Sequence, residues 1–86
     1  MELERLKTFV AVAEAGSFSK AANELFVSHS TTSRAVSALE DELGVKLFER
    51  DNRVFGLTDA GRLLLLRSKE LLSLAETLET ELKTMK

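Results

Sequence analysis

The sequence predicts a mainly α-helical fold, with three short helices, a small β-hairpin and one long last helix. Two observations predict it. Apolar residues recur at helical spacing along most of the 86 residues, whereas short extended patterns occur only at residues 47–57. Proline is absent, and the four glycines are the main markers of turns and of the ends of predicted elements. For a chain of this length, we expect one small domain, or one domain with an extended element.

The first two helices are predicted at residues 2–15 and 18–25. Gly16 suits the left-handed end of the first helix, and Ser17 is a good N-cap for the second. Each segment has one apolar stripe at helical spacing. The stripes are Leu3, Leu6, Phe9, Val10 and Ala13 in the first helix, and Phe18, Ala21, Ala22 and Leu25 in the second.

The third helix is predicted from the N-cap Ser28 to Leu43, with Gly44 as its stop. Its apolar face lies within about 60° on a helical wheel. The other face is short, polar and almost free of acid. Acidic residues occur only at 40–42, and we expect a cationic partner there because acids oppose the dipole at a helix C-terminus. The apolar face is Thr32, Val36, Leu39 and Leu43, and the polar face is Ser30, Ser33, Arg34 and Ser37.

Residues 47–57 predict a hairpin, and Thr58 caps a last helix that could run to the terminus. The four leucines at 63–66 point all the way round this helix, so one side can face the chain's own core. Beyond them runs an apolar seam that a second copy of the chain, or a further domain, would cover. The predicted dimer interface is Leu64, Leu71, Ala75, Leu78, Leu82 and Met85.

The composition excludes several classes of site. Without cysteine there is no disulfide scaffold, thiolate metal site or cysteine nucleophile, and the single histidine, His29, excludes a multi-histidine metal site. Ser28 and His29 are adjacent, so they cannot pair as nucleophile and base on one helix face, and no glycine-rich phosphate loop is present. We therefore expect no enzyme activity, no metal and no cofactor.

Charge and hydropathy limit the expected partners. The net charge of -2 argues against a general polycation but allows a local basic surface. The longest uninterrupted apolar run, residues 63–66, is far too short for a bilayer span, and the start of the chain lacks a signal peptide. We therefore expect neither membrane contact nor export.

Two helices, a short turn and a third helix with a small polar outer face form a helix-turn-helix pattern. A helix that enters the major groove needs short side chains, hydrogen-bonding groups and an arginine. Its N-terminus should lead, because free backbone N–H groups favour phosphate there. The first half of the third helix meets these conditions, which predicts binding to double-stranded DNA.

At these residues the chain resembles the N-terminal DNA-binding domain of LysR-type transcriptional regulators. The matching strings are LKTFVAVAEAGSFSKAANELFVS, SRAVSALEDELGVKLFER and LTDAG, in order and without a gap. The resemblance implies a winged helix-turn-helix over residues 1–58 and a linker and dimerisation helix over residues 59–86. It further implies a bacterial, cytoplasmic, nucleoid-associated homodimer on an inverted-repeat promoter site. A small-molecule effector would act only through a domain absent from this chain.

The resemblance also implies individual DNA contacts, and three positions depart from the family pattern. Glutamine and proline are usual where His29 and Ser30 stand, and histidine can donate to guanine where glutamine pairs with adenine. Thr32 replaces a usual aliphatic residue, and its hydroxyl could bond to the Ser28 carbonyl. Gly56 stands where a basic residue is common. The implied contacts are Ser17, Ser28, His29, Ser30, Thr31, Ser33 and Arg34, with Arg50 and Arg53 on the wing.

Two alternatives bear on these assignments. The phenylalanines could be stacking platforms for single-stranded nucleic acid, but their apolar patterns favour the core. The more serious rival is a helical dimerisation or protein-interaction module, in which the leucine seam is the function and the third helix is ordinary surface. The five phenylalanines are Phe9, Phe18, Phe26, Phe48 and Phe55.

Overall fold

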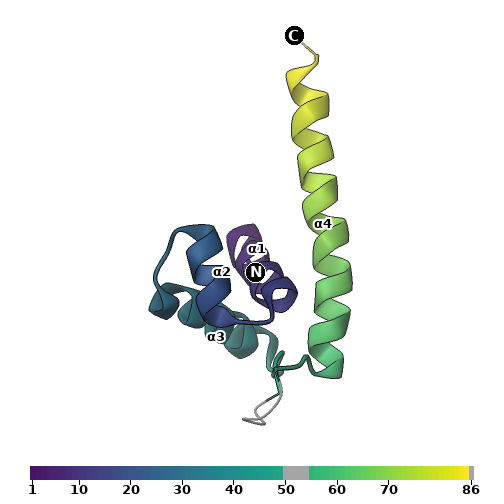
Figure 1. Cartoon of the computed structure of the whole chain (residues 1–86). Coiled ribbons are helices and arrows are strands. Elements are labelled where there is room, and N and C mark those ends of the chain that lie inside the picture. The colour runs from purple at the N-terminus through teal and green to yellow at the C-terminus, as the bar shows by residue number, and fades with distance from the viewer. Residues whose placement is uncertain (50–54, 86) are drawn as a thin grey trace.

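A computed structural model describes residues 1–49 and 55–85. Within them lie four helices, α1 (Leu3–Ala15), α2 (Phe18–Leu25), α3 (His29–Leu43) and α4 (Asp59–Lys83). The first three form a compact body, and α4 lies beside α1 and extends well beyond the body toward the C-terminus (Figure 1). The predicted helices are confirmed, although α1 begins one residue later than expected and α4 ends at Lys83.

The helix ends follow the predicted capping residues. Gly16 and Gly44 take left-handed conformations, with φ of 69° and 70°, where a side chain would be strained. The Ser17 hydroxyl accepts a hydrogen bond from the Lys20 N–H at 3.1 Å. The Thr58 hydroxyl accepts one from the Gly61 N–H at 3.0 Å and so caps α4.

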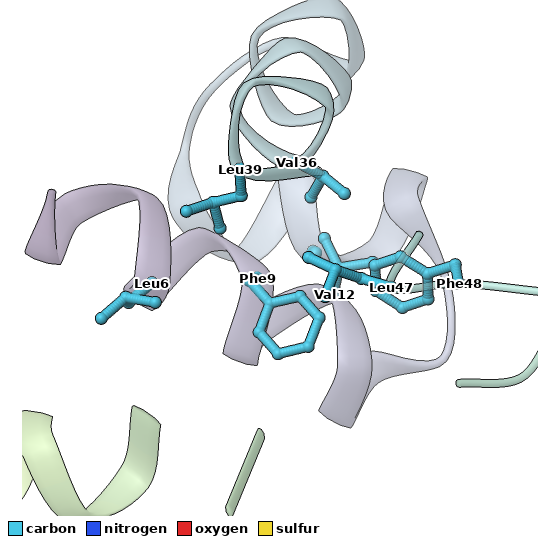
Figure 2. Close-up of a cluster of buried hydrophobic side chains, with 8 residues drawn as sticks. Leu6, Phe9, Val12, Val36, Leu39, Leu47 and Phe48 are labelled. Carbon is cyan, nitrogen blue, oxygen red and sulfur yellow. The ribbon is translucent and has the colours of Figure 1, made fainter. Parts of the chain in front are cut away.

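The core lies where α1, α3 and the segment after α3 meet (Figure 2). It is almost entirely aliphatic and aromatic, and this burial is the main source of stability in so small a domain. α2 closes the core with two small residues, Ala21 and Ala22, so that it packs closely against its neighbours. The side chains at the centre are Leu6, Phe9, Val12, Val36, Leu39, Leu47 and Phe48.

The expected hairpin is reduced to its base in the described residues. Phe48 and Leu57 form one isolated antiparallel bridge, and the Glu49 N–H donates to the Gly56 carbonyl at 2.8 Å. Across residues 1–49 and 55–85 the pairing extends to no regular strand. The two predicted wing contacts, Arg50 and Arg53, lie outside the described residues.

Four of the described residues expected in the core are exposed, among them Leu3 at 46% and Phe55 at 42%. Phe26 leaves 95% of its surface exposed, because it follows the last residue of α2 in a left-handed conformation with φ of 58°. This conformation ends the helix, with the Val27 N–H bonded to the Ala22 carbonyl at 3.0 Å, and turns the phenyl ring away from the body. Leu43 is likewise largely exposed, at the end of α3.

The start of α4 is held tightly against the segment after α3. The Thr58 N–H donates to the Leu47 carbonyl at 3.0 Å, and the Thr58 hydroxyl donates to the Lys46 carbonyl at 2.6 Å. Gly61 approaches the Leu47 carbonyl so closely that an added Cβ would overlap the oxygen.

No helix in the described part of the chain is long and apolar enough to cross a membrane.

Candidate nucleic-acid interface

The first turn and the outer face of α3 carry the side chains predicted to touch DNA. His29, Ser30, Thr31 and Arg34 are exposed, and Ser33 is half-buried. Within residues 1–49 and 55–85, Arg34 makes no ion pair, so its guanidinium is available to an anion or a base edge. Short polar side chains beside an arginine form a surface that fits a DNA groove.

The N-terminus of α3 is held by hydrogen bonds among its own hydroxyls. The Ser28 hydroxyl accepts from the Thr31 N–H at 3.0 Å and donates to the Thr31 hydroxyl at 2.9 Å. It therefore has no proton left for a phosphate unless that second bond opens. The Ser17 hydroxyl, by contrast, accepts in its cap and donates to no other described residue, so its proton is available to a phosphate.

Thr32 anchors the recognition helix from the core side. Its side chain is fully buried, and its hydroxyl donates to the Ser28 carbonyl at 3.1 Å. The hydroxyl therefore lies in the core without an unmet hydrogen bond, as the sequence predicted. This bond ties the first turn of α3 to its cap and fixes the helix end that faces outward.

Two acidic residues at the C-terminal end of α3 make contacts within the protein. The buried Glu40 carboxylate accepts a hydrogen bond from the Leu47 N–H at 2.8 Å. Glu42 pairs with Arg5 and with the amino group of Met1, each at 3.0 Å, which are the expected cationic partners. The hydrogen bond from the Met1 amino group, assisted by Arg5, lowers the pKa of the Glu42 carboxyl. Much of the negative charge at this end is thus engaged by the protein itself.

The predicted dimer residues lie within about 80° on a helical wheel but differ in burial. Leu64 packs against the chain's own core and Ala75 is half-buried, on the side where Ser68 is fully buried. The other four are exposed, together with Leu74 and Leu63, which the sequence interpretation missed. These six residues lie within about 100° on a helical wheel that is continued past Lys83 to include Met85, which follows the end of α4. We call them the outer stripe: Leu63, Leu71, Leu74, Leu78, Leu82 and Met85.

Leu74 could have been found from the sequence. Its spacing of three and four from Leu71 and Leu78 is as regular as that of the residues chosen. The two apolar sides of α4 are adjacent on the wheel, so the predicted dimer interface stays a prediction, to which Leu74 is added. Among the described residues, no group of three or more histidine, aspartate or glutamate side chains is placed to hold a metal ion.

Comparison with known proteins agrees with this geometry. Residues 3–62 match the family described as bacterial regulatory helix-turn-helix protein, lysR family. The chain is 46% identical over 76 residues to the HTH-type transcriptional regulator TfdT of Cupriavidus pinatubonensis, a match that covers 88% of this chain and 33% of TfdT. Other matched relatives are likewise named transcriptional regulators or activators rather than enzymes.

Solved structures similar to this chain include DNA complexes. A BenM DNA-binding domain with catB site 1 DNA is 38% identical, with a TM-score of 0.94, covering 99% of this chain and 96% of that one. A CbnR DNA-binding domain with DNA is 42% identical, with a TM-score of 0.92, covering 98% and 97%. The chain spans between 31% and 53% of the length of the curated relatives TfdT, an Azotobacter vinelandii regulator and AllS of Klebsiella pneumoniae.

Proposed function

The chain belongs to the LysR family of bacterial regulatory helix-turn-helix proteins and is a DNA-binding domain, and from this premise we propose that it reads a specific double-stranded site as a homodimer. The observation that carries the proposal is the exposed outer face of α3, which presents an arginine without an ion pair among the described residues, and no acid in its first half. Such a face suits close approach to the major groove.

Each α3 lies in a major groove in the proposed complex, with phosphate contacts setting its register and base contacts its specificity. His29, Ser30 and Arg34 supply most of the base readout. His29 favours guanine, because its imidazole N–H can donate a hydrogen bond to that base. Ser17, Ser33 and the N-terminal N–H groups of α3 contact phosphates. Ser28 and Thr31 hold that N-terminus. Ser28 reaches phosphate only if its hydrogen bond to Thr31 opens, whereas the Thr31 hydroxyl accepts that bond and can donate its own proton to a phosphate.

The wing contacts are proposed from the resemblance alone. Arg50 and Arg53 lie outside the described residues, and we assign them to the flanking DNA backbone. The mild net charge of -2 predicts modest non-specific affinity and a shallow salt dependence for one domain. Tight binding then depends on two domains engaging their half-sites together.

We propose that the outer stripe of α4 joins two copies of the chain. The stripe presents large apolar side chains along almost the whole helix, more exposed leucine than an isolated monomer would keep in water. Its heptad-like spacing suits a second helix. Two-fold symmetry of the pair then predicts an inverted-repeat site.

In this proposal residues 1–58 form the DNA-binding unit and residues 59–86 the dimerisation helix. The domain acts on DNA in the bacterial cytoplasm, at the nucleoid. Any small-molecule effector acts through a different domain of the regulator, as the resemblance implies.

A competing function is a dimerisation or interaction module that does not read DNA. The exposed outer stripe alone would serve that role equally well. The two proposals differ in the outer face of α3, because only a DNA reader needs Arg34.

The test is binding of Arg34→Ala to a site selected from a randomised duplex pool. We expect specific affinity to fall by about tenfold to a hundredfold, the size of one arginine–base contact. Dimerisation and helicity, measured by sedimentation and circular dichroism, should not change. Lys7→Ala, which removes one positive charge from α1, is the matched control and should bind normally. Equal affinity of Arg34→Ala and the unaltered chain would favour the interaction module.

A further inference from the structure

A chain of aromatic side chains reaches from the core to the base-reading end of α3. The ring centroids of Phe18 and His29 lie 6.0 Å apart, with their planes at 47°. Tilted pairs at such separations are a favoured arrangement of aromatic rings. His29 is exposed, so one side of its imidazole meets Phe18 and the other side is open to a ligand.

Phe18 is itself held in place from beneath. Its half-buried ring lies 5.5 Å from the buried Phe48 ring and 6.2 Å from the Phe55 ring. Phe48 continues the contact to Phe9 in the centre of the core, at 5.5 Å. Because core side chains are densely packed in single rotamers, the orientation of Phe18 is set by the body and not by solvent.

The position of His29 on α3 allows the Phe18 ring to orient its imidazole. It is the first residue of α3, and on a helical wheel it falls about 50° from the centre of the core face. An exposed side chain there would otherwise sample several rotamers. Contact with Phe18 removes some of that freedom before DNA arrives, which lowers the ordering cost of binding.

We propose that Phe18 is a positioning residue for base readout: it directs the His29 imidazole toward one base edge without touching DNA itself. The inference rests on the proposed function, in which His29 reads a base. It assigns to α2 a part in specificity beyond its N-cap, because Phe18 immediately follows the cap Ser17.

A purely structural role for Phe18 makes a different prediction. If the ring only fills space, its loss weakens binding to every duplex to the same extent. If it orients His29, its loss changes base preference at the one half-site position that His29 reads, and has little further effect once His29 is removed.

The experiment is a double-mutant cycle on the 86-residue chain. Phe18→Leu, His29→Ala and the double variant are titrated against the selected site and against duplexes substituted at each half-site position. Phe9→Leu removes a ring from the same cluster without a ring contact to His29 and controls for a loosened core. Phe18→Tyr keeps the ring and should restore the preference. All titrations are made well below the melting temperature of each variant.

We expect Phe18→Leu to reduce base preference at the His29 position by about threefold to tenfold, the size of one aromatic pair. In the His29→Ala background, Phe18→Leu should leave preference at that position unchanged. An equal loss at all positions, or a preference that Phe9→Leu alters as much, would overturn the inference. If His29→Ala alone leaves base preference intact, the assignment of His29 in the proposed function fails first, and this inference fails with it.

Discussion

The two sides of α4 have opposite environments, although both are apolar. The inner side, toward α1 and the segment after α3, contains three small residues among its leucines, and two of these small residues are its most buried members. The outer stripe contains only leucines and a methionine, and it is exposed. The inner side is Gly61, Leu64, Leu65, Ser68, Leu72 and Ala75.

The more hydrophobic side of this helix is therefore the one that faces away from the chain's own body. Close approach of a helix to its own backbone needs space, and Gly61 and Ser68 provide it. Large side chains on the outer stripe instead suit a partner that brings large side chains of its own. Hydrophobicity alone does not tell these two kinds of burial apart.

Loss of the outer stripe should separate the dimer without unfolding the monomer. Leu78→Asp places a charge in the proposed interface of both copies, so we expect the dimer dissociation constant to rise about a hundredfold or more. Affinity for an inverted repeat should fall with it. Sedimentation equilibrium measures the first effect and circular dichroism checks the helicity.

Thr80→Asp is the matched control, because it adds the same charge on the opposite side of α4, about 150° from the centre of the stripe. It should dimerise normally. A Leu78→Asp variant that still dimerises as tightly would rule out the outer stripe as the interface.

A side chain at Gly61, on the inner side of α4, should instead destabilise the fold of the monomer. In Gly61→Ala the added Cβ overlaps the Leu47 carbonyl oxygen, and the backbone there cannot move without breaking the Thr58 hydrogen bond. We expect a loss of about 3 kcal/mol in unfolding free energy, or about 15 °C in Tm. Thermal unfolding followed by circular dichroism measures it.

Gly56→Ala is the control for this substitution. Among the described residues, its added Cβ would meet the Glu49 Cγ alone, at 3.8 Å, which is an ordinary contact. Equal stability of the Gly61→Ala and Gly56→Ala variants would mean that α4 does not need this close approach.

Replacing Ser68, on the same inner side, should increase the stability of the domain. Its hydroxyl oxygen is fully buried and finds no hydrogen-bond partner among residues 1–49 and 55–85. Ser68→Ala removes an unsatisfied polar group, so we expect a gain of about 1 kcal/mol, or about 5 °C in Tm. Ser73→Ala, on an exposed position of α4, measures the helix propensity that must be subtracted. A loss of stability in Ser68→Ala, after that subtraction, would show that the hydroxyl is bonded in solution.

An exposed ion pair between α4 and α1, at the edge of the inner side, should contribute the least to stability. Lys69 on α4 pairs with Glu14 on α1 at 2.6 Å, and both side chains are about half exposed. Exposed ion pairs contribute little and are screened by salt. Lys69→Ala should therefore lower the unfolding free energy by about 0.5 kcal/mol at low salt and by nothing measurable at 1 M salt. A loss that persists at high salt would point to packing of the lysine stem instead.

Local chemistry made much of the candidate site predictable. Ser17, Ser28 and Thr58 were identified as caps because a hydroxyl at a helix start has one favourable use, and all three accept the expected backbone N–H. The Thr32 bond to the Ser28 carbonyl followed from the spacing of four residues. Each of these interactions lies within a single turn of chain.

Interactions between distant segments were not predictable in the same way. Phe26 was expected in the core because it is apolar, yet its left-handed backbone turns it outward. The acidic residues 40–42 were expected to need a cationic partner, but burial of Glu40 and its hydrogen bond from the Leu47 N–H depend on the segment after α3. The contact of Phe18 with His29 depends on how α2 crosses α3, which no local pattern contains.

Capping, periodicity and short motifs are properties of neighbouring residues, so the helices, most of their ends and the family could be predicted from the chain alone. Packing set which side of α4 faces the body, where Phe26 points and what holds the His29 ring. Those outcomes depend on the space between packed elements, and a side chain's hydrophobicity does not specify that space.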